Sequence, residues 1–335
     1  MLSLAFDFSF EDLYSQTGLA RLDARFIDYL ADVDAGLSDR LRAARSGAVP
    51  AGKEHSELLL ALAPHVEDFI VRLFGIETAA DALRQDHSDL EPLFRVKRFF
   101  VQRRAAHLHP REVAEGLDDV ELLRMLALPF APSSPQFELA FARAVLTWEA
   151  DSAAHATQLR AALDYSAWAL HSSRAREVHG RGTLFQVPQK TDPLRLIPLA
   201  PAGRALKLAA TQAVKAHGHR DGFDLTDNGC DLTGALDQAN YCIGCHNQGK
   251  DSCSHGLKQG TGEFRRNPLG VLLTGCPLEE RISEFLVLKA EGRPLAALAM
   301  IMLDNPMVAA TGHRICNDCM KACIYQKQQP VDIPQ

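Results

Sequence analysis

The distribution of cysteine constrains this chain of 335 residues more than any other feature of its sequence. All eight cysteines lie at or after Cys230, so the first 229 residues contain none. Those that follow Cys230 fall into short-spaced groups: Cys242, Cys245, Cys253, Cys276, Cys316, Cys319 and Cys323. Thiols gathered in this way favour metal ligation, because a metal centre needs several soft ligands within reach of one another.

The remaining composition is that of an ordinary globular protein, with 47% hydrophobic and 23% charged residues and enough length for two domains. A net charge of -6 gives no support for a nucleic-acid partner. The first twelve residues lack the basic start of a secretory signal, and no apolar run is long enough to span a membrane. We therefore expect a cytoplasmic protein, in which clustered cysteines indicate metal or redox chemistry rather than disulfides.

Helical periodicity dominates roughly the first 175 residues. Apolar side chains recur there at three- and four-residue spacing, as in Leu58, Leu62 and Val66, and alternating strand patterns are scarce. We predict an all-α protein in three parts. They are a helical bundle domain of unknown role at 1–177, a linker containing proline and glycine at 178–220, and a cysteine-bearing domain at 221–335.

Three patterns in the cysteine-free region have simpler explanations than a functional site. Asp151 and His155 have metal-ligand spacing, but a pair without further ligands favours a solvated helix face. The basic and aromatic run at 95–104 could bind nucleic acid, but an amphipathic helix with a basic face explains it more simply, and that face could instead dock an acidic partner surface. The glycines at 180–182 form half of a dinucleotide fingerprint at best, so we predict no nucleotide-binding site in this chain.

Three kinds of metal centre compete for the cysteines. The segment 242–246 matches the C-x-x-C-H pattern of c-type haem, which would leave five clustered cysteines unexplained. A structural zinc could bind the two C-x-x-C pairs at 242–245 and 316–319, leaving three cysteines unused. Two cubane clusters need about eight ligands, and close spacing with a proline after one cysteine, as in Cys276-Pro277, is typical of them. We favour the cubane clusters.

The order of the motifs adds a resemblance to a known family. After the C-x-x-C pair and Cys276-Pro277 come two expected helices at 278–291 and 294–304, then Asn305-Pro306 and a closing cysteine trio. Residues 242–335 thereby resemble the N-terminal iron–sulfur domain of the glutamate synthase small subunit and of dihydropyrimidine dehydrogenase. That domain is an α-helical ferredoxin found in FAD- and NAD(P)-dependent oxidoreductases of the pyridine nucleotide-disulfide type. The stretch between Cys253 and Cys276 is longer here than in that family.

The resemblance implies two [4Fe-4S] clusters and a division of the ligands between them. One cluster would be held by Cys242, Cys245, Cys253 and Cys323, and three ligands of the other would be Cys276, Cys316 and Cys319. The family's fourth ligand, a glutamate or glutamine, would fall just beyond Gln335. The weaker candidates for a ligand are Gln335, Cys230, His246 and His255. We expect both histidines to lie beside the site or to face solvent.

The resemblance also implies an electron-transfer role. In such proteins the domain passes single electrons between a flavin and a redox partner protein. The FAD and NAD(P)H would then lie on a flavin/NAD(P)-binding domain of a longer parent chain or on a partner subunit, because this chain shows no hydride-transfer site and no catalytic residue. A non-catalytic interaction module with a structural zinc site is the alternative.

Overall fold

The computed structural model describes residues 4–192, 222–223, 229–312 and 316–334. Within these ranges the protein is all-α, and the only β-type pairings there are isolated bridges, which confirms the predicted fold class. None of the helices in these ranges combines the length and the apolar character needed to cross a bilayer, as predicted. Most of the predicted linker, residues 193–220, lies outside the described residues.

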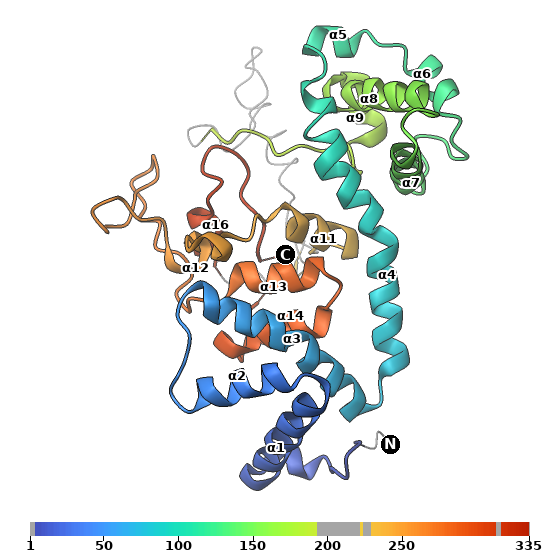
Figure 1. The fold of residues 1–335 in the computed structure, drawn as a ribbon. Helices are drawn as coiled ribbons and strands as arrows, with labels where there is room; N and C mark the ends of the chain where they lie inside the picture. Colours follow the sequence, from blue (N-terminus) through green and yellow to red (C-terminus); the bar gives the residue numbers. More distant parts are fainter. Residues whose placement is uncertain (1–3, 193–221, 224–228, 313–315, 335) are drawn as a thin grey trace.

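The N-terminal part, shown in blue in Figure 1, contains a 3-10 turn, η1 (Glu11–Tyr14), and three α-helices: α1 (Gln16–Val33), α2 (Ala35–Arg45) and α3 (Lys53–Phe74). Ser15 caps α1 by accepting a hydrogen bond from the Gly18 N–H at 3.0 Å. The stripe predicted on α3 is partly correct, because Leu58 and Leu62 are buried in a core with α1 and α2, whereas Val66 is half-buried. Gly75 ends α3 in a left-handed conformation.

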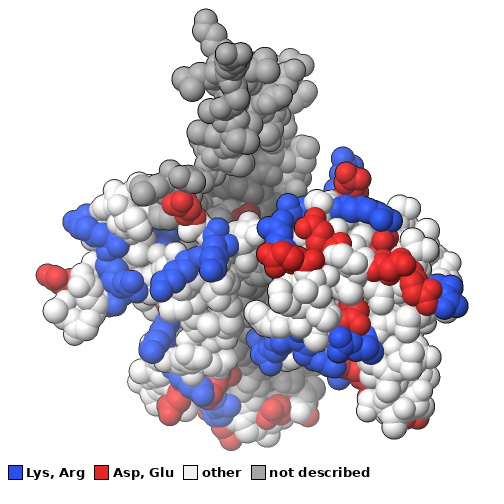
Figure 2. Space-filling model, turned by 90° about the horizontal axis from the view of Figure 1, so that it is seen from above, with Lys and Arg blue, Asp and Glu red and all other residues white. Residues whose placement is uncertain are grey.

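A long helix, α4 (Glu77–Val96), runs from this part to an upper lobe and continues into one π-helical turn, η2 (Lys97–Val101). The lobe contains η3 (Ala105–His107), α5 (Arg111–Glu115), α6 (Asp119–Leu126), α7 (Phe137–Ala150), α8 (Ala156–His171) and α9 (Ser173–His179). Its core is aromatic, with Phe137, Phe141 and Tyr165 fully buried. On the face seen in Figure 2, basic and acidic side chains are interspersed.

The cysteine-bearing part consists of short helices joined by turns. They are α11 (Leu232–Tyr241), η4 (Cys245–Gln248), α12 (Ser252–His255), α13 (Ile282–Ala290), α14 (Pro294–Asp304), α15 (Val308–Thr311) and α16 (Asp318–Ala322). The helix predicted at 294–304 is confirmed. The helix predicted at 278–291 begins only at Ile282, because Glu279 adopts a left-handed φ of 50° that an α-helix does not accept.

Helix α3 packs directly on the cysteine-bearing part (Figure 1). Ala63 joins the core formed by α13 and α14, and the buried Glu67 accepts a hydrogen bond from the Ala296 N–H at 2.9 Å. On another side, Lys97 of η2 forms an ion pair of 2.6 Å with Asp237 of α11. The packing therefore crosses the boundary expected at residue 177, and that boundary stays a prediction.

Candidate metal centres

Four cysteines from three stretches of chain line one small cavity, here called the first cavity. They are Cys242, Cys245, Cys253 and Cys323. Helix α11 ends at Tyr241 and leaves Cys242 in extended backbone, while Gly244 reverses the chain with a φ of 63°. The Gly244 N–H lies 3.4 Å from the Cys242 sulfur, which suits donation to a thiolate. Two cysteines of the C-x-x-C pair therefore reach the same space from one turn.

Burial raises the pKa of three thiols of the first cavity, those of Cys242, Cys245 and Cys253. The pKa of Cys242 is raised to about 11, mainly by burial and in smaller part by the neighbouring Cys245 and Cys323, while the hydrogen bond from Gly244 lowers it. Burial is also the main cause of the raised pKa of Cys253, followed by the charge of Asp251. A bound cationic centre would reverse this balance, because metals bind thiolates and displace their protons. Four soft donors line one cavity, three of them buried and Cys242 partly exposed, and this donor set suits a metal cluster.

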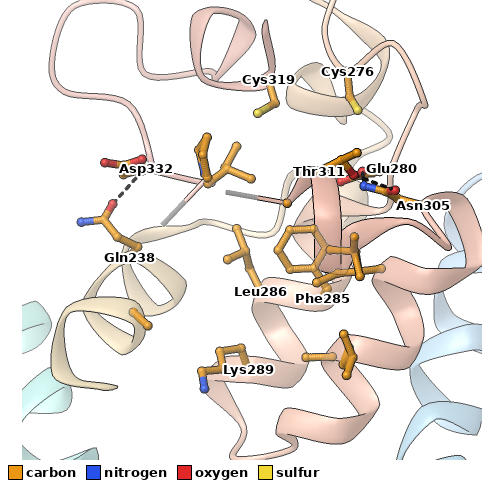
Figure 3. Close-up of a pocket in the computed structure, with 18 of the residues that line it drawn as sticks. Gln238, Cys276, Glu280, Phe285, Leu286, Lys289, Asn305, Thr311, Cys319 and Asp332 are labelled. Atoms are coloured by element: carbon orange, nitrogen blue, oxygen red, sulfur yellow. Dashed lines mark hydrogen bonds between the residues drawn. The ribbon is translucent and has the colours of Figure 1, made fainter. Parts of the chain in front are cut away.

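The seven cysteines from Cys242 to Cys323 are here called the array. Its other three members, Cys276, Cys316 and Cys319, line a second cavity of about 410 Å³ (Figure 3). The pKa of Cys319 is raised to about 12, mainly by burial and in smaller part by Cys276 and Cys316, so both of these thiols lie within electrostatic reach of Cys319. Burial also raises the pKa of Cys276, whereas hydrogen bonds from the backbone N–H groups of Glu280 and Leu278 lower it. Such donors stabilise charge on sulfur.

The two cavities are neighbours. Leu286 and Ile333 line both of them. The Cys276 N–H donates to the Cys253 carbonyl at 2.9 Å, which ties one cysteine of each set together. Helix α16 carries Cys319 and is followed at once by Cys323, so one short helix serves both cavities.

The structure separates the four thiols that a shared zinc site would require, because 242–245 line the first cavity and 316–319 the second. Among the described residues, no three His, Cys, Asp or Glu side chains converge closely enough to hold a single metal ion. A four-iron cluster binds each thiolate at a different iron, so its ligands stand farther apart than those of one ion.

The weaker ligand candidates lie elsewhere or outside the description. Cys230 is exposed and precedes α11. His246 is buried, with Nδ1 2.6 Å from the Ser283 hydroxyl, and the exposed His255 has Nδ1 3.6 Å from Glu279. Gln335 lies outside the described residues.

Two features beside the cavities were missed in the sequence. Glu280 lines the second cavity, but a single acidic residue after Cys276-Pro277 carries no pattern that distinguishes it. Tyr325 lines both the first cavity and a cleft of about 800 Å³ that extends to η2. Its ring stacks on Tyr241 at a centroid distance of 4.5 Å. The sequence does not reveal this contact, because Tyr241 and Tyr325 are about 80 positions apart.

Comparison with known proteins assigns the family. Residues 4–75 match a family described as the RP005 N-terminal alpha-helical domain. The chain is 30% identical over 309 residues to "Uncharacterized protein RP005" of Rickettsia prowazekii (strain Madrid E), a match that covers 87% of this chain and 99% of that protein. A shorter match, 89% identical over 28 residues, to "Uncharacterized protein RP006" of the same organism covers 8% of this chain and 4% of that protein. No solved structure is significantly similar.

These matches overturn the resemblance of residues 242–335 to the glutamate synthase small subunit and dihydropyrimidine dehydrogenase, which was wrong as a family assignment. The RP005 match covers 87% of the chain and therefore extends into the cysteine-bearing third. The motifs that suggested the other family are short, and C-x-x-C pairs recur wherever thiolates must reach one metal centre. The chain belongs to the RP005 family.

Proposed function

We propose that this protein is an electron carrier that holds two [4Fe-4S] clusters in its C-terminal third and passes single electrons between redox partners. One observation carries the proposal: seven cysteines divide into a set of four and a set of three, and each set lines its own cavity. The sets interleave along the chain, since Cys323 follows Cys316 and Cys319 yet joins the first cavity. Folding therefore sorts the seven thiols into one group of four and one of three, which supports two separate centres.

The residues around the sulfur atoms suit such a role. The N–H of Gly244 faces the Cys242 sulfur, and the N–H groups of Leu278 and Glu280 face that of Cys276. Hydrogen bonds to sulfur and burial are the means by which proteins set the reduction potential of iron–sulfur clusters. When bound, the clusters would supply one-electron oxidation and reduction. The cavities share a wall at Leu286 and Ile333, which supports electron passage between them.

Electrons would be exchanged with the partner protein at the large cleft beside the first cavity. Tyr325 supports this location, because it lines both the cleft and the first cavity. Only the overturned resemblance supported a flavin/NAD(P)-binding partner, so we define the partner here as an oxidoreductase protein or domain. Free, clustered cysteines are typical of a reducing compartment, and we therefore also propose a cytoplasmic location.

Metal analysis of the protein purified without oxygen tests the proposal. Two cubane clusters require about eight iron and about eight acid-labile sulfide per chain, with broad absorbance near 400 nm. Stoichiometric zinc without sulfide would contradict electron transfer and favour a structural zinc site instead. Protein that contains neither metal after cluster reconstitution would contradict both readings.

A further inference from the structure

The second cavity offers three cysteines to a cluster that needs four ligands. A [4Fe-4S] cluster has four iron corners, and each normally binds one protein ligand. Cys276, Cys316 and Cys319 account for three of them. The described residues that line this cavity also include two carboxylates, Glu280 and Asp332, either of which could bind iron through oxygen.

Glu280 lies on the cysteine side of the cavity. Its backbone N–H donates to the Cys276 thiol, and its carboxylate acts electrostatically on that same thiol. In Figure 3, Cys276, Cys319 and Glu280 lie toward one end of the cavity, whereas Leu286 and Lys289 lie toward the other. The Asp332 carboxylate acts instead on the thiol of Cys230, which lies outside the array. Of the two carboxylates, Glu280 is thus the one that belongs to a residue hydrogen-bonded to a cysteine of this set.

A buried amide orients the Glu280 side chain. The Asn305 Nδ2 donates to Glu280 Oε1 at 2.9 Å, and Asn305 is only 7% exposed. Because an ionised carboxylate only accepts hydrogen bonds, the Asn305 nitrogen faces Glu280, and Oδ1 of Asn305 lies 3.2 Å from the Thr311 hydroxyl, which also lies 3.1 Å from the Met307 carbonyl. Metal-binding carboxylates are commonly held by such a hydrogen bond on one oxygen while the other binds the metal. Oε2 of Glu280 is then the atom available to iron.

We propose that Glu280 is the fourth protein ligand of the second cluster, completing the set of Cys276, Cys316 and Cys319. This inference rests on the proposed function, since it requires a cluster in the second cavity. It makes that cluster chemically unequal to the first, with three thiolates and one carboxylate. The iron bound by oxygen is the corner held least tightly, because carboxylate is a harder ligand than thiolate.

Two variants of Glu280 test the assignment in protein purified without oxygen. Glu280→Ala is expected to lose about one iron of about eight per chain and to show the electron paramagnetic resonance signal of an oxidised three-iron cluster. Glu280→Cys is expected to retain all the iron while changing the spectrum of the reduced second cluster. Glu291→Ala is the matched control, because this glutamate is exposed and lines neither cavity, so it is expected to leave iron content and spectrum unchanged.

The outcomes separate this inference from the proposed function. Wild-type protein without iron and sulfide would contradict the proposed function itself. Wild-type protein with two clusters, together with a Glu280→Ala variant that keeps all its iron and shows no three-iron signal, would contradict the Glu280 assignment alone. If Glu280→Ala does not fold, Glu280→Cys decides, because an unchanged spectrum in that variant would also overturn the assignment.

Discussion

Two glycines determine how the chain leaves Cys253 and returns to Cys276. Gly256 and Gly275 have φ angles of 79° and 81°, which side-chain-bearing residues rarely adopt. A Cβ atom on Gly275 would lie 2.5 Å from the Gly256 nitrogen and 2.6 Å from the Ser254 carbonyl oxygen. These contacts are with backbone atoms, so no side chain can move aside to relieve them. The close crossing holds the Cys253 and Cys276 segments together.

Gly275→Ala is therefore expected to lower the free energy of unfolding by about 1–3 kcal/mol through backbone strain, with further loss from the clash. Denaturant unfolding followed by circular dichroism measures this change. Gly260→Ala is the control, because a Cβ atom there would meet nothing within 4 Å, and we expect a change within about 0.5 kcal/mol. Equal stability of the two variants would show that the crossing is not constrained as described.

His179 makes the upper lobe sensitive to acid. Burial lowers its pKa to about 4, and its Nε2 lies 2.8 Å from the Tyr165 hydroxyl in the aromatic core. The unfolded chain, with a His pKa of about 6.5, binds more protons between these two values, so stability falls as pH decreases through that range. The contribution lost by pH 4.5 is on the order of 2–3 kcal/mol.

Unfolding measured at pH 7 and pH 4.5 tests this statement. The stability difference between the two pH values is expected to be smaller in His179→Gln than in the wild type. His255→Gln is the control, since His255 is exposed and should keep the wild-type dependence. If His179→Gln lost as much stability in acid as the wild type, a group other than His179 would govern the response.

At the scale of elements, Glu67 joins three helices. Its side chain is 1% exposed and accepts hydrogen bonds from Arg84 of α4 at 2.6 Å and from the Ala296 N–H of α14 at 2.9 Å. Arg293, just before α14, adds a contact of 3.4 Å. A buried carboxylate with this many donors fixes the angle at which α3 meets the cysteine-bearing part.

Glu67→Ala is expected to lower the free energy of unfolding by about 3 kcal/mol, because the Ala296 N–H loses its acceptor and two guanidinium groups keep only their contacts with Asp68 and, for Arg84, with Asp81. The value lies at the low end for buried pairs since Arg84 and Arg293 are partly exposed. Glu57→Ala, on the same helix, is the control: its contact with Lys53 is exposed, and we expect a change within about 0.5 kcal/mol. A similarly small effect of Glu67→Ala would contradict its structural role.

Sequence patterns predicted the helices better than the packing of one helix against another. The periodic stripe containing Leu58 and Leu62 indicated a helix and its buried side. The opposite side of the same helix packs on α13 and α14 through Ala63, which periodicity could not indicate because it carries no information about distant segments. The start of α13 was predicted four residues early, because a left-handed Glu279 leaves no trace in hydrophobic spacing.

The division of the cysteines shows the same limit. A C-x-x-C spacing predicts that Cys242 and Cys245 share a centre. It does not predict that Cys319 and Cys323, only four positions apart, line different cavities. That separation depends on α16 ending at Ala322, after which Cys323 adopts extended backbone with ψ of 143°. Only the overturned resemblance implied this division before the structure.

At the scale of the whole molecule, the N-terminal family domain is part of the support for the cavities. Residues 4–75 match the RP005 N-terminal domain, and α3 within this range packs against the helices that line the second cavity. The upper lobe connects through α4 and the ion pair between Lys97 and Asp237. The second cavity is therefore supported from the N-terminal part by α3, and the cysteine-bearing part is also tied to the upper lobe.

The iron content of two single variants tests the central claim most directly. Cys245 lines the first cavity and Cys319 the second, so Cys245→Ser and Cys319→Ser are each expected to lose about half of the iron and sulfide. Cys230→Ser, outside both cavities, is expected to keep all of both. Loss of all the iron from a folded Cys245→Ser or Cys319→Ser variant would contradict two separate clusters.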